Sequence, residues 1–366
     1  MNSPQITIVG AGIGGLTLGI ELRRRGFDVQ IWEATRELRE VGAAVALSAN
    51  ATRFYLERFG LESELAAAWA EVDGLIHRDG RTGRIVGRHH TRSSYREQFG
   101  APYVGIHRAD LQRILAGAFG AEGLHLSKRV ITIDDDGPRA TLDFEDGDSA
   151  QADLVIGADG ARSTVRKLML GYDFALYSGA SASRGIVTPE ALSELPDPEA
   201  IQFWMGPGAH LLHYPIGSGE QNFFLVQRCP APWPHKSWVV PVEEGSPLEG
   251  FRDWHPAVVQ MITAVPVTER WGLFHRPPLS RWSRGRITLL GDAAHALVPH
   301  HGQGANQSIE DAIVLADPGM FDRHLSWIHG FRADTEIPDD AAGGTWLSAV
   351  CPATFCRAVS CAAHQH

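Results

Sequence analysis

Residues Gln5-Ile-Thr-Ile-Val9-Gly10-Ala-Gly12-Ile-Gly14-Gly15 decide the fold of this 366-residue chain. The β-branched run predicts a strand, and the glycines after it match the pattern G-x-G-x-x-G at Gly10, Gly12 and Gly15. In this pattern the first glycine makes a tight turn, the second lets a pyrophosphate approach the backbone, and the third lets a helix pack closely on the strand. The helix and second strand that follow complete a βαβ unit, which predicts a parallel sheet.

The acidic residue Glu33 ends the second predicted strand, 27–33, eighteen residues after Gly15. A carboxylate at this position can accept hydrogen bonds from the ribose hydroxyls of an adenosine. The start of the helix between the strands offers unpaired N–H groups and a partial positive charge to a phosphate. A purely structural glycine-rich turn is the alternative, but both strands and the acidic residue favour a dinucleotide site.

Composition limits the class of protein. The chain is 44% apolar and 21% charged, which is typical of a globular protein with two domains. A formal charge of −10 argues against a surface for nucleic acid or anionic lipid, and no run of about 20 apolar residues predicts a membrane span. Three of the four cysteines lie in the last sixteen residues, which excludes a disulfide scaffold. We expect a cytoplasmic monomer or homodimer whose partner is a small molecule.

Two later segments decide which dinucleotide is bound. Residues 153–163 read as a strand followed by the turn Asp159-Gly160, and residues 287–295 as a strand that ends in Gly291-Asp292 at the head of a helix. Together with the first motif, they resemble the three signatures of the FAD-dependent aromatic hydroxylases. These are the class A single-component flavoprotein monooxygenases, which include salicylate, hydroxybenzoate and 6-hydroxynicotinate hydroxylases. The resemblance covers roughly residues 5–317.

The resemblance implies an α/β fold with a Rossmann-like FAD-binding domain of the p-hydroxybenzoate hydroxylase type. A mostly antiparallel β-sheet substrate domain is inserted into it. We expect the FAD-binding domain at 1–172 and 280–317, the substrate domain at 173–279, and an atypical tail at 318–366. The sequence itself supports the inserted sheet domain, because strands bounded by Gly and Pro between about 174 and 279 predict an antiparallel sheet.

FAD is therefore the expected cofactor, with NADPH or NADH and O2 as co-substrates. Asp292 can bind a ribityl hydroxyl, and N–H groups of the loop 299–306 can stabilise negative charge at the N1–C2=O2 edge of the reduced flavin. The resemblance places Arg108 near the flavin and Arg162 near the nicotinamide nucleotide. A surface charge at Arg108 and a plain helix-entry loop at 302–304 are the alternatives.

The complete set of residues predicted to contact FAD combines the motifs with positions that the resemblance implies: Gly10, Gly12, Gly14, Gly15, Glu33, Ala34, Gly42, Ala43, Arg108, Val130, Asp159, Asp292, Gly302, Gln303, Gly304, Ala305 and Asn306.

The expected reaction transfers oxygen from a flavin C4a-hydroperoxide to an aromatic or heteroaromatic ring that the protein makes electron-rich by deprotonation. On the strand around 210–215, alternation places His210, Leu212 and Tyr214 on one face. His210 and Tyr214 resemble the substrate-facing pair of hydroxypyridine and hydroxybenzoate hydroxylases, and His300 resembles a third ring-facing residue. We expect His210 to be the base, with Tyr214 and His300 orienting the substrate. With seventeen histidines in the chain, structural roles are the alternative for each.

No metal site is expected. The histidines between 295 and 301 lack a carboxylate or thiolate at ligand spacing, and the three cysteines after residue 350 lie in a tail too short for a zinc fold.

The family pattern stops after Asp317, because Pro318-Gly319 breaks the helix. Either the reading frame changed near Asp317 or the chain is a natural variant that ends differently. The sequence predicts an FAD- and NAD(P)H-dependent aromatic hydroxylase. The alternatives are an FAD-binding protein whose altered C-terminus impairs turnover, and a flavin reductase or halogenase of the same fold.

Overall fold

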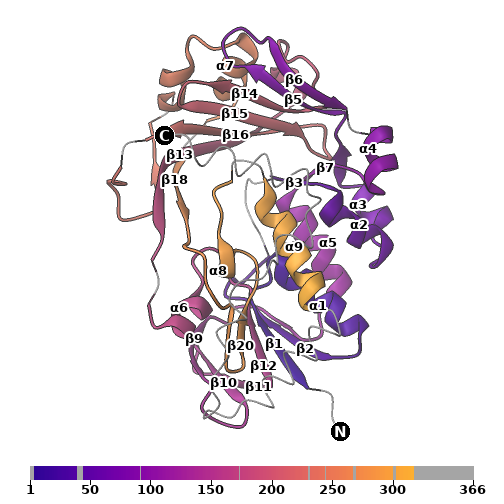
Figure 1. Ribbon diagram of the computed structural model, residues 1–366, viewed down its shortest axis with the longest axis vertical. Coiled ribbons are helices and arrows are strands. Elements are labelled where there is room, and N and C mark those ends of the chain that lie inside the picture. The colour runs from indigo at the N-terminus through magenta and orange to yellow at the C-terminus, as the bar shows by residue number, and fades with distance from the viewer. Residues whose placement is uncertain are drawn as a thin grey trace. The chain divides into compact units, whose positions relative to one another are not determined.

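The parallel sheet predicted from the first motif is present in the computed structural model (Figure 1), which describes residues 4–38, 44–90, 92–172, 174–229, 231–243, 245–266, 269–299 and 302–316. All of these residues belong to one compact unit, Met1–Arg323. Within them the sheet has the strand order β19-β20-β12-β1-β2-β8, and β1 pairs in parallel with both β2 and β12. Its strands are β1 (Gln5–Val9), β2 (Asp28–Trp32), β8 (Leu124–His125), β12 (Leu154–Gly157), β19 (Ser283–Arg284) and β20 (Ile287–Leu289). The strands of the three motifs, β1, β12 and β20, are therefore neighbours in the sheet.

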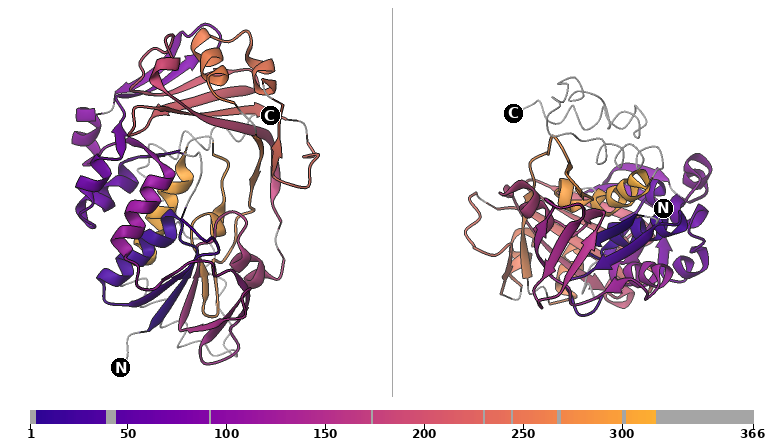
Figure 2. Two further views of the ribbon diagram at one scale, coloured as in Figure 1. Left: turned by 180° about the vertical axis from the view of Figure 1, so that it is seen from behind. Right: turned by 90° about the horizontal axis from the view of Figure 1, so that it is seen from below.

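Three helices pack together beside this sheet. The helix α1 (Ile13–Arg24) contacts α5 (Arg108–Phe119) and α9 (Gln303–Leu315), and it lies alongside α9 in two opposite views (Figures 1 and 2). Leu16, Leu18 and Leu22 of α1 are fully buried, as expected for a helix that crosses over a parallel sheet. Burial of such leucines contributes about 1.5–3 kcal/mol each. The predicted βαβ unit is confirmed.

Two small sheets and several short helices complete this part of the chain. The sheet β11-β10-β9 is antiparallel, and in the sheet β3-β7-β4 the central strand β7 pairs antiparallel with both neighbours. Their strands are β3 (Ala44–Leu47), β4 (Trp69–Glu71), β7 (Val104–His107), β9 (Val130–Asp134), β10 (Ala140–Phe144) and β11 (Ser149–Ala152). The remaining helices are α2 (Ala49–Glu57), α3 (Glu62–Ala66), α4 (Arg92–Phe99), α6 (Thr164–Leu170), α7 (Pro256–Thr263) and α8 (Asp292–His295). None of the described helices has both the length and the apolar character that a bilayer crossing requires.

A larger sheet has the order β17-β18-β13-β16-β15-β14-β5-β6 and is antiparallel except where β14 pairs with β5. Its strands are β5 (Gly74–Asp79), β6 (Ile85–His90), β13 (Leu176–Val187), β14 (Ile201–Gly206), β15 (Ala209–Pro215), β16 (Gln221–Arg228), β17 (Val239–Pro241) and β18 (Glu269–His275). Because β5 and β6 precede residue 173, this sheet takes strands from both sides of the predicted boundary. The division at 173 and 279 stays a prediction.

The two faces of the larger sheet have different neighbours. One face packs Trp204, Leu211 and Phe223 against α7 in a continuous apolar cluster. The opposite face packs Leu212 and Tyr214 against other residues, which include Ala46 of β3. Alternation along β15 therefore separates a closed structural face from the face that carries the predicted catalytic residues.

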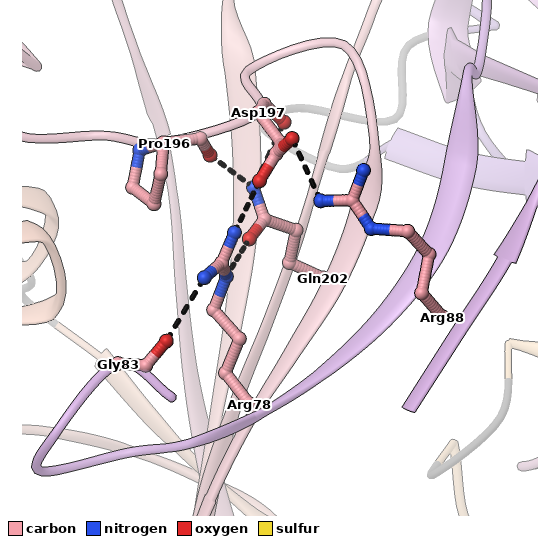
Figure 3. Close-up of polar contacts among 6 residues, drawn as sticks. All are labelled: Arg78, Gly83, Arg88, Pro196, Asp197 and Gln202. Carbon is pink, nitrogen blue, oxygen red and sulfur yellow. Dashed lines mark hydrogen bonds and ion pairs between the residues drawn. The ribbon is translucent and has the colours of Figure 1, made fainter. Parts of the chain in front are cut away.

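A buried arginine supports the α7 side of this sheet (Figure 3). Arg78 donates from Nε to Gln202 Oε1 at 2.6 Å and from Nη1 to the carbonyl of Gly83 at 2.9 Å, and it forms an ion pair with Asp197. Arg88 donates to the other oxygen of Asp197 at 2.9 Å. Because the guanidinium is satisfied on several sides, this network fixes the loop before β14 onto the sheet.

Two glycines allow the first two motifs to touch. Gly10 has a φ of +107°, and a Cβ added there would lie 2.5 Å from the carbonyl oxygen of Ala158, which follows β12. A Cβ added to Gly15 would lie 2.2 Å from the carbonyl oxygen of Gly10. Both neighbours are backbone atoms, so neither can move aside as a side-chain end could. The turn between β1 and α1 therefore requires glycine for packing as well as for ligand access.

We expect Gly15→Ala to lower the free energy of unfolding by about 2 kcal/mol or more, because the added methyl overlaps a backbone carbonyl. Urea denaturation followed by circular dichroism measures the change. The matched control is Gly117→Ala in α5, where an added Cβ meets no atom within 4 Å. That substitution should raise stability by about 0.5–1 kcal/mol. Equal effects of the two substitutions would contradict the packing argument.

Candidate functional site

The start of α1 is open to an anion. Gly12 is the N-cap residue, no described side chain caps the helix, and its first turn contains no acidic residue. A Cβ on Gly12 would meet no atom within 4 Å, so no part of the described protein fills the space beside it. Gln112 of α5 holds the turn by donating from Nε2 to the carbonyl of Ala11 at 2.8 Å. The first N–H groups of α1 are therefore available to a phosphate.

Glu33 is fixed beside this turn. Its Oε2 accepts a hydrogen bond from the Ala11 N–H at 2.9 Å, and its Oε1 accepts one from the Thr35 N–H at 2.8 Å. The Thr35 hydroxyl donates to Oε1 as well, at 2.9 Å, whereas Oε2 has a second lone pair that can still accept from a ribose hydroxyl. Ala34 follows it in the chain, while the side chain of Val130 is buried in a neighbouring apolar cluster.

The carboxylate of Asp159 is used by the protein itself. It accepts hydrogen bonds from the backbone N–H groups of Thr164 at 2.6 Å and Val165 at 3.1 Å, and from the Ser163 hydroxyl. Burial raises the pKa of Asp159, while these donors oppose the rise. Asp159 therefore caps α6 and shapes the turn, and its predicted contact with FAD stays a prediction.

Asp292 presents a carboxylate that no described residue hydrogen-bonds. Burial raises the pKa of this group, and the positive charges of Arg108 and His295 oppose the rise. A Cβ added to Gly304 would lie 3.7 Å from Asp292 Oδ1, so the first turn of α9 passes beside the carboxylate. A partly buried acceptor of this kind fits a ribityl hydroxyl.

Asp311 of α9 holds the Asp292 turn. One oxygen, Oδ2, accepts a hydrogen bond from the Gly291 N–H at 3.1 Å and lies 2.6 Å from His295 Nε2. Burial lowers the pKa of His295, but the hydrogen bond and the charge of Asp311 outweigh burial, and the net shift is upward. When His295 is protonated it forms an ion pair with Asp311, and this contact ties α8 to α9.

The start of α9 resembles the start of α1. Gly302 is the N-cap residue, no described side chain caps the helix, and Gln303, Gly304 and Ala305 form the first turn. Asn306 is fully buried: it donates from Nδ2 to the carbonyl of Ala46 at 2.9 Å and accepts the Ser48 N–H at 2.9 Å. Asn306 therefore binds β3 and the residue after it to α9 with its side chain, and its predicted contact with FAD stays a prediction.

Arg108 connects the Asp292 turn with the larger sheet. It is the first residue of α5, and His107 caps this helix by accepting the Ala109 N–H at 3.2 Å. The charge of Arg108 acts on both Asp292 and Tyr214 and lowers the pKa of each against the opposite effect of burial. Arg108 therefore lies within electrostatic reach of both groups, which favours the predicted position near a flavin over a surface charge.

The register of β15 confirms the predicted face. His210 lies opposite Val226 and Tyr214 opposite Asn222 on β16, while Leu212 and Tyr214 share an apolar cluster. Tyr214 is almost completely buried beside Gly105 of β7, and burial raises the pKa of its phenol. The catalytic roles of His210 and Tyr214 stay predictions.

His213 lies on the opposite face and is fully buried. Its Nδ1 lies 3.1 Å from Gln221 Oε1, and burial lowers the pKa of the imidazole to about 4. This histidine is neutral at physiological pH and has a structural role.

Several predicted positions fall outside the described residues: Gly42, Ala43, His300 and the tail 318–366. Their predicted roles stay predictions. Across the part of the chain that is described, no three His, Cys, Asp or Glu side chains gather in a way that could hold a metal ion. The absence of a metal site also stays a prediction.

The geometry fits FAD. Two helix starts free of side-chain caps can face anionic or electron-rich groups, Glu33 can receive the adenosine ribose, and Asp292 has acceptor capacity for the ribityl chain. The start of α1, Glu33 and Asp292 follow the carboxyl ends of β1, β2 and β20, which is where open α/β sheets bind nucleotides, and α9 packs against α1.

Comparison with known proteins agrees with this class. The family described as FAD binding domain matches residues 3–317. The chain is 36% identical over 312 residues to a 3-amino-4-hydroxybenzoate 2-monooxygenase of Streptomyces cremeus, covering 85% of this chain and 77% of that protein. It is 33% identical over 314 residues to a 6-hydroxynicotinate 3-monooxygenase of Bordetella bronchiseptica, covering 85% and 82%. The crystal structure of Klebsiella pneumoniae HpxO complexed with FAD and uric acid has a TM-score of 0.75 at 30% identity, covering 86% of this chain and 79% of that one.

The fold and the site define a flavoprotein with a parallel nucleotide-binding sheet and a second, mostly antiparallel sheet. The chain belongs to the FAD-dependent aromatic hydroxylases, and it is an FAD-dependent monooxygenase of the p-hydroxybenzoate hydroxylase fold.

Sequence reasoning missed two supporting residues. Gln112 holds the glycine turn, and Asp311 holds the Asp292 turn. Asp311 is six residues before Asp317, where the predicted family pattern ends, but nothing in its spacing indicates that it pairs with His295. Gln112 gives no signal at all, because it lies on the buried side of α5, 101 positions from its partner.

Gly12→Ala separates ligand access from folding. The substitution should raise the Kd for FAD about tenfold or more, which corresponds to roughly 1.4 kcal/mol, because the methyl occupies the space where a pyrophosphate approaches. The free energy of unfolding of the FAD-free protein should fall by no more than about 1 kcal/mol, the cost of alanine at an N-cap, since an added Cβ meets no atom of the described residues within 4 Å. Titration by flavin fluorescence measures the affinity. A variant that binds FAD normally would show that the phosphate lies elsewhere.

The ion pair between His295 and Asp311 predicts a pH dependence. The folded-state pKa of His295 is raised, so its contribution to stability is fully present below the unfolded pKa of about 6.5 and is lost as pH rises through the folded pKa. The stability difference between the wild type and His295→Gln should be largest near pH ~5.5 and should shrink as pH rises above ~6.5. Urea denaturation at several pH values measures it. A difference that grows with pH would contradict the assignment.

Proposed function

We propose that this FAD-dependent monooxygenase hydroxylates an aromatic or heteroaromatic ring that carries an ionisable hydroxyl group, with NADPH or NADH as reductant and O2 as oxidant. One observation carries the proposal: the charge of Arg108 reaches both Asp292, in the predicted flavin site, and Tyr214, on the predicted substrate face. The predicted flavin site and the predicted substrate face, which the reaction must bring together, thus both lie within electrostatic reach of the Arg108 guanidinium.

The relatives support this substrate class. Their names specify 3-amino-4-hydroxybenzoate and 6-hydroxynicotinate, and both compounds carry a hydroxyl and a carboxylate on an aromatic ring. Uric acid, bound in the Klebsiella structure, is also a planar and acidic heterocycle. We infer that the substrate of this chain is a hydroxylated aromatic or heteroaromatic acid or phenol.

FAD supplies the redox chemistry when bound: it takes a hydride from the nicotinamide nucleotide and passes one atom of O2 to the ring. The side chains of this protein make the ring reactive. His210 accepts the proton from the ring hydroxyl at an imidazole nitrogen, which raises the electron density of the ring. Tyr214, held in place by its burial, donates a hydrogen bond that orients the same oxygen. The apolar neighbours Leu212 and Phe224 exclude water from this face.

The nicotinamide nucleotide is proposed to bind near the turn after Asp159. The guanidinium of Arg162 lies 5.0 Å from the centroid of Trp238, and Arg276 donates two hydrogen bonds to the carbonyl of Ala161, at 3.0 and 2.7 Å. The turn is thereby fixed with two cations beside it, and such an arrangement suits a phosphate-bearing ligand.

The test is substrate-stimulated oxidation of NADPH or NADH by the purified FAD protein, with hydroxylated product measured by chromatography. His210→Gln should lower the rate of hydroxylation about 10²-fold or more, because the substrate stays protonated, and should leave the Kd for FAD unchanged. The matched control is His235→Gln, at an exposed position. Bound FAD without stimulation by any member of a panel of phenols and hydroxy acids would contradict the proposal and favour a flavin-binding protein without turnover.

A further inference from the structure

The face of the larger sheet that carries Tyr214 also carries an arginine. Residues that lie opposite each other on adjacent strands point to the same side, so the register of β13, β16 and β15 defines rows across this face. The three rows are Ala182–Val226–His210, Arg184–Phe224–Leu212 and Ile186–Asn222–Tyr214. Arg184 therefore occupies the middle row, between the row of the proposed base and the row of the buried tyrosine.

The neighbours of Arg184 on β13 show which space it faces. Ala182 packs in a cluster that includes Val298, which is four residues before Gly302, the N-cap of α9. The first turn of α9 passes beside Asp292. Ile186 packs against the cluster of Tyr214 and Ala46, and Ala46 is hydrogen-bonded to α9. Arg184 lies between these two contacts on the same side of the strand. Its side chain thus points toward the space bounded by the segment before α9 and by Tyr214.

The guanidinium of Arg184 is partly buried and is placed by an aromatic ring. Its Cζ lies 4.6 Å from the ring centroid of Trp271 on β18. An arginine donates its hydrogen bonds within the guanidinium plane, so contact with an aromatic ring leaves its N–H geometry suited to a carboxylate. The charge also reaches Tyr214, where it lowers the pKa of the phenol against the effect of burial.

The distance between the strands β13 and β15 suits one aromatic ring. Two strand spacings, about 9.6 Å, separate the backbones of β13 and β15. The side chains of Arg184 and His210 both extend from this face and narrow the gap. A ring with a hydroxyl at one end and an anionic substituent at the other can therefore contact a base on β15 and a cation from β13 at the same time.

We propose that Arg184 binds the carboxylate of an aromatic acid substrate and makes the enzyme select hydroxy acids over neutral phenols. The inference rests on the proposed function, since it assigns a substrate group to the same face of the sheet. Arg184 is on this view a specificity-determining residue: it holds the end of the ring remote from the proton transfer, while His210 and Tyr214 act at the hydroxyl.

The experiment compares each acid with its carboxamide, which has the same shape and no charge. The probes are 3-hydroxybenzoate against 3-hydroxybenzamide and 6-hydroxynicotinate against 6-hydroxynicotinamide. Binding to the FAD-loaded protein is read from the perturbation of the flavin absorption spectrum, which requires no turnover. The wild type should bind at least one acid more than tenfold more tightly than its amide.

The variants separate charge from packing. Arg184→Met should raise the Kd of the preferred acid about 30-fold or more and change that of the amide less than threefold, because only the acid loses an ionic hydrogen bond. Arg184→Lys should restore part of the preference, since the charge remains while the planar donor pair is lost. The control is Arg270→Met, which removes a neighbouring β18 arginine that lies over Trp233 instead. It should leave the ratio of acid to amide affinity unchanged.

The outcomes distinguish this inference from the proposed function. Equal weakening of acid and amide by Arg184→Met would show that the arginine only supports Trp271, and the inference would be wrong. A wild type that binds acid and amide equally, or binds neither, would also overturn it, even if another phenol is hydroxylated. Acid binding that depends on Arg184 without any stimulated oxidation of NADPH would support the inference while contradicting the proposed function.

Discussion

The structure depends on the contact of two backbone turns at the end of β1. The carbonyl oxygen of Ala158 and that of Gly10 lie where side chains would stand on Gly10 and Gly15. This contact, together with the hydrogen bond from the Ala158 N–H to the carbonyl of Val9 at 2.8 Å, aligns β12 with β1. The strand β20 then pairs with β12, so the carboxyl ends of three strands from distant parts of the chain meet. A ligand site at that edge follows from the pairing.

The starts of the helices show how this edge is specialised. α5, α6 and α7 begin with a side chain of His107, Ser163 or His255 that accepts a backbone N–H, as is usual for helices whose ends serve stability alone. α1 and α9 begin instead at glycine, with no cap from any described side chain. The helices α2, α3 and α8 also begin without a side-chain cap, so the open N–H groups of α1 and α9 agree with the predicted cofactor contacts without proving them. A glycine in place of a capping side chain costs only a few tenths of a kcal/mol at the start of α1 and at the start of α9.

The sequence was informative where the signal is local. The glycine pattern from Gly10 to Gly15 predicts the turn, and the alternation in 210–214 predicts which residues share a face; the structure confirms both. Interactions between distant residues could not be predicted in this way. The amide of Asn306 binds Ala46, 260 positions away. The carboxylate of Asp159 caps α6 through a local contact, which its residue type alone did not distinguish from a contact with the cofactor. Residue type indicated cofactor contacts for both, whereas three-dimensional packing determines which polar groups their side chains meet first.

Strand alternation gives the larger sheet one face whose residues have structural roles and another face that carries the proposed catalytic residues. On the side of α7, burial lowers the pKa of His213 to about 4 and keeps it neutral, and Arg78 is enclosed by Gln202 and Asp197. On the other side, Tyr214 is buried within the influence of two cations, Arg108 and Arg184. Positive charge on this side favours any bound group that becomes an anion, whether a carboxylate or a ring hydroxyl that loses its proton. A shift of one residue in the register of β15 would exchange the two faces and turn His210 and Tyr214 toward α7, so the pairing of β15 with β16 is itself a requirement of the proposed chemistry.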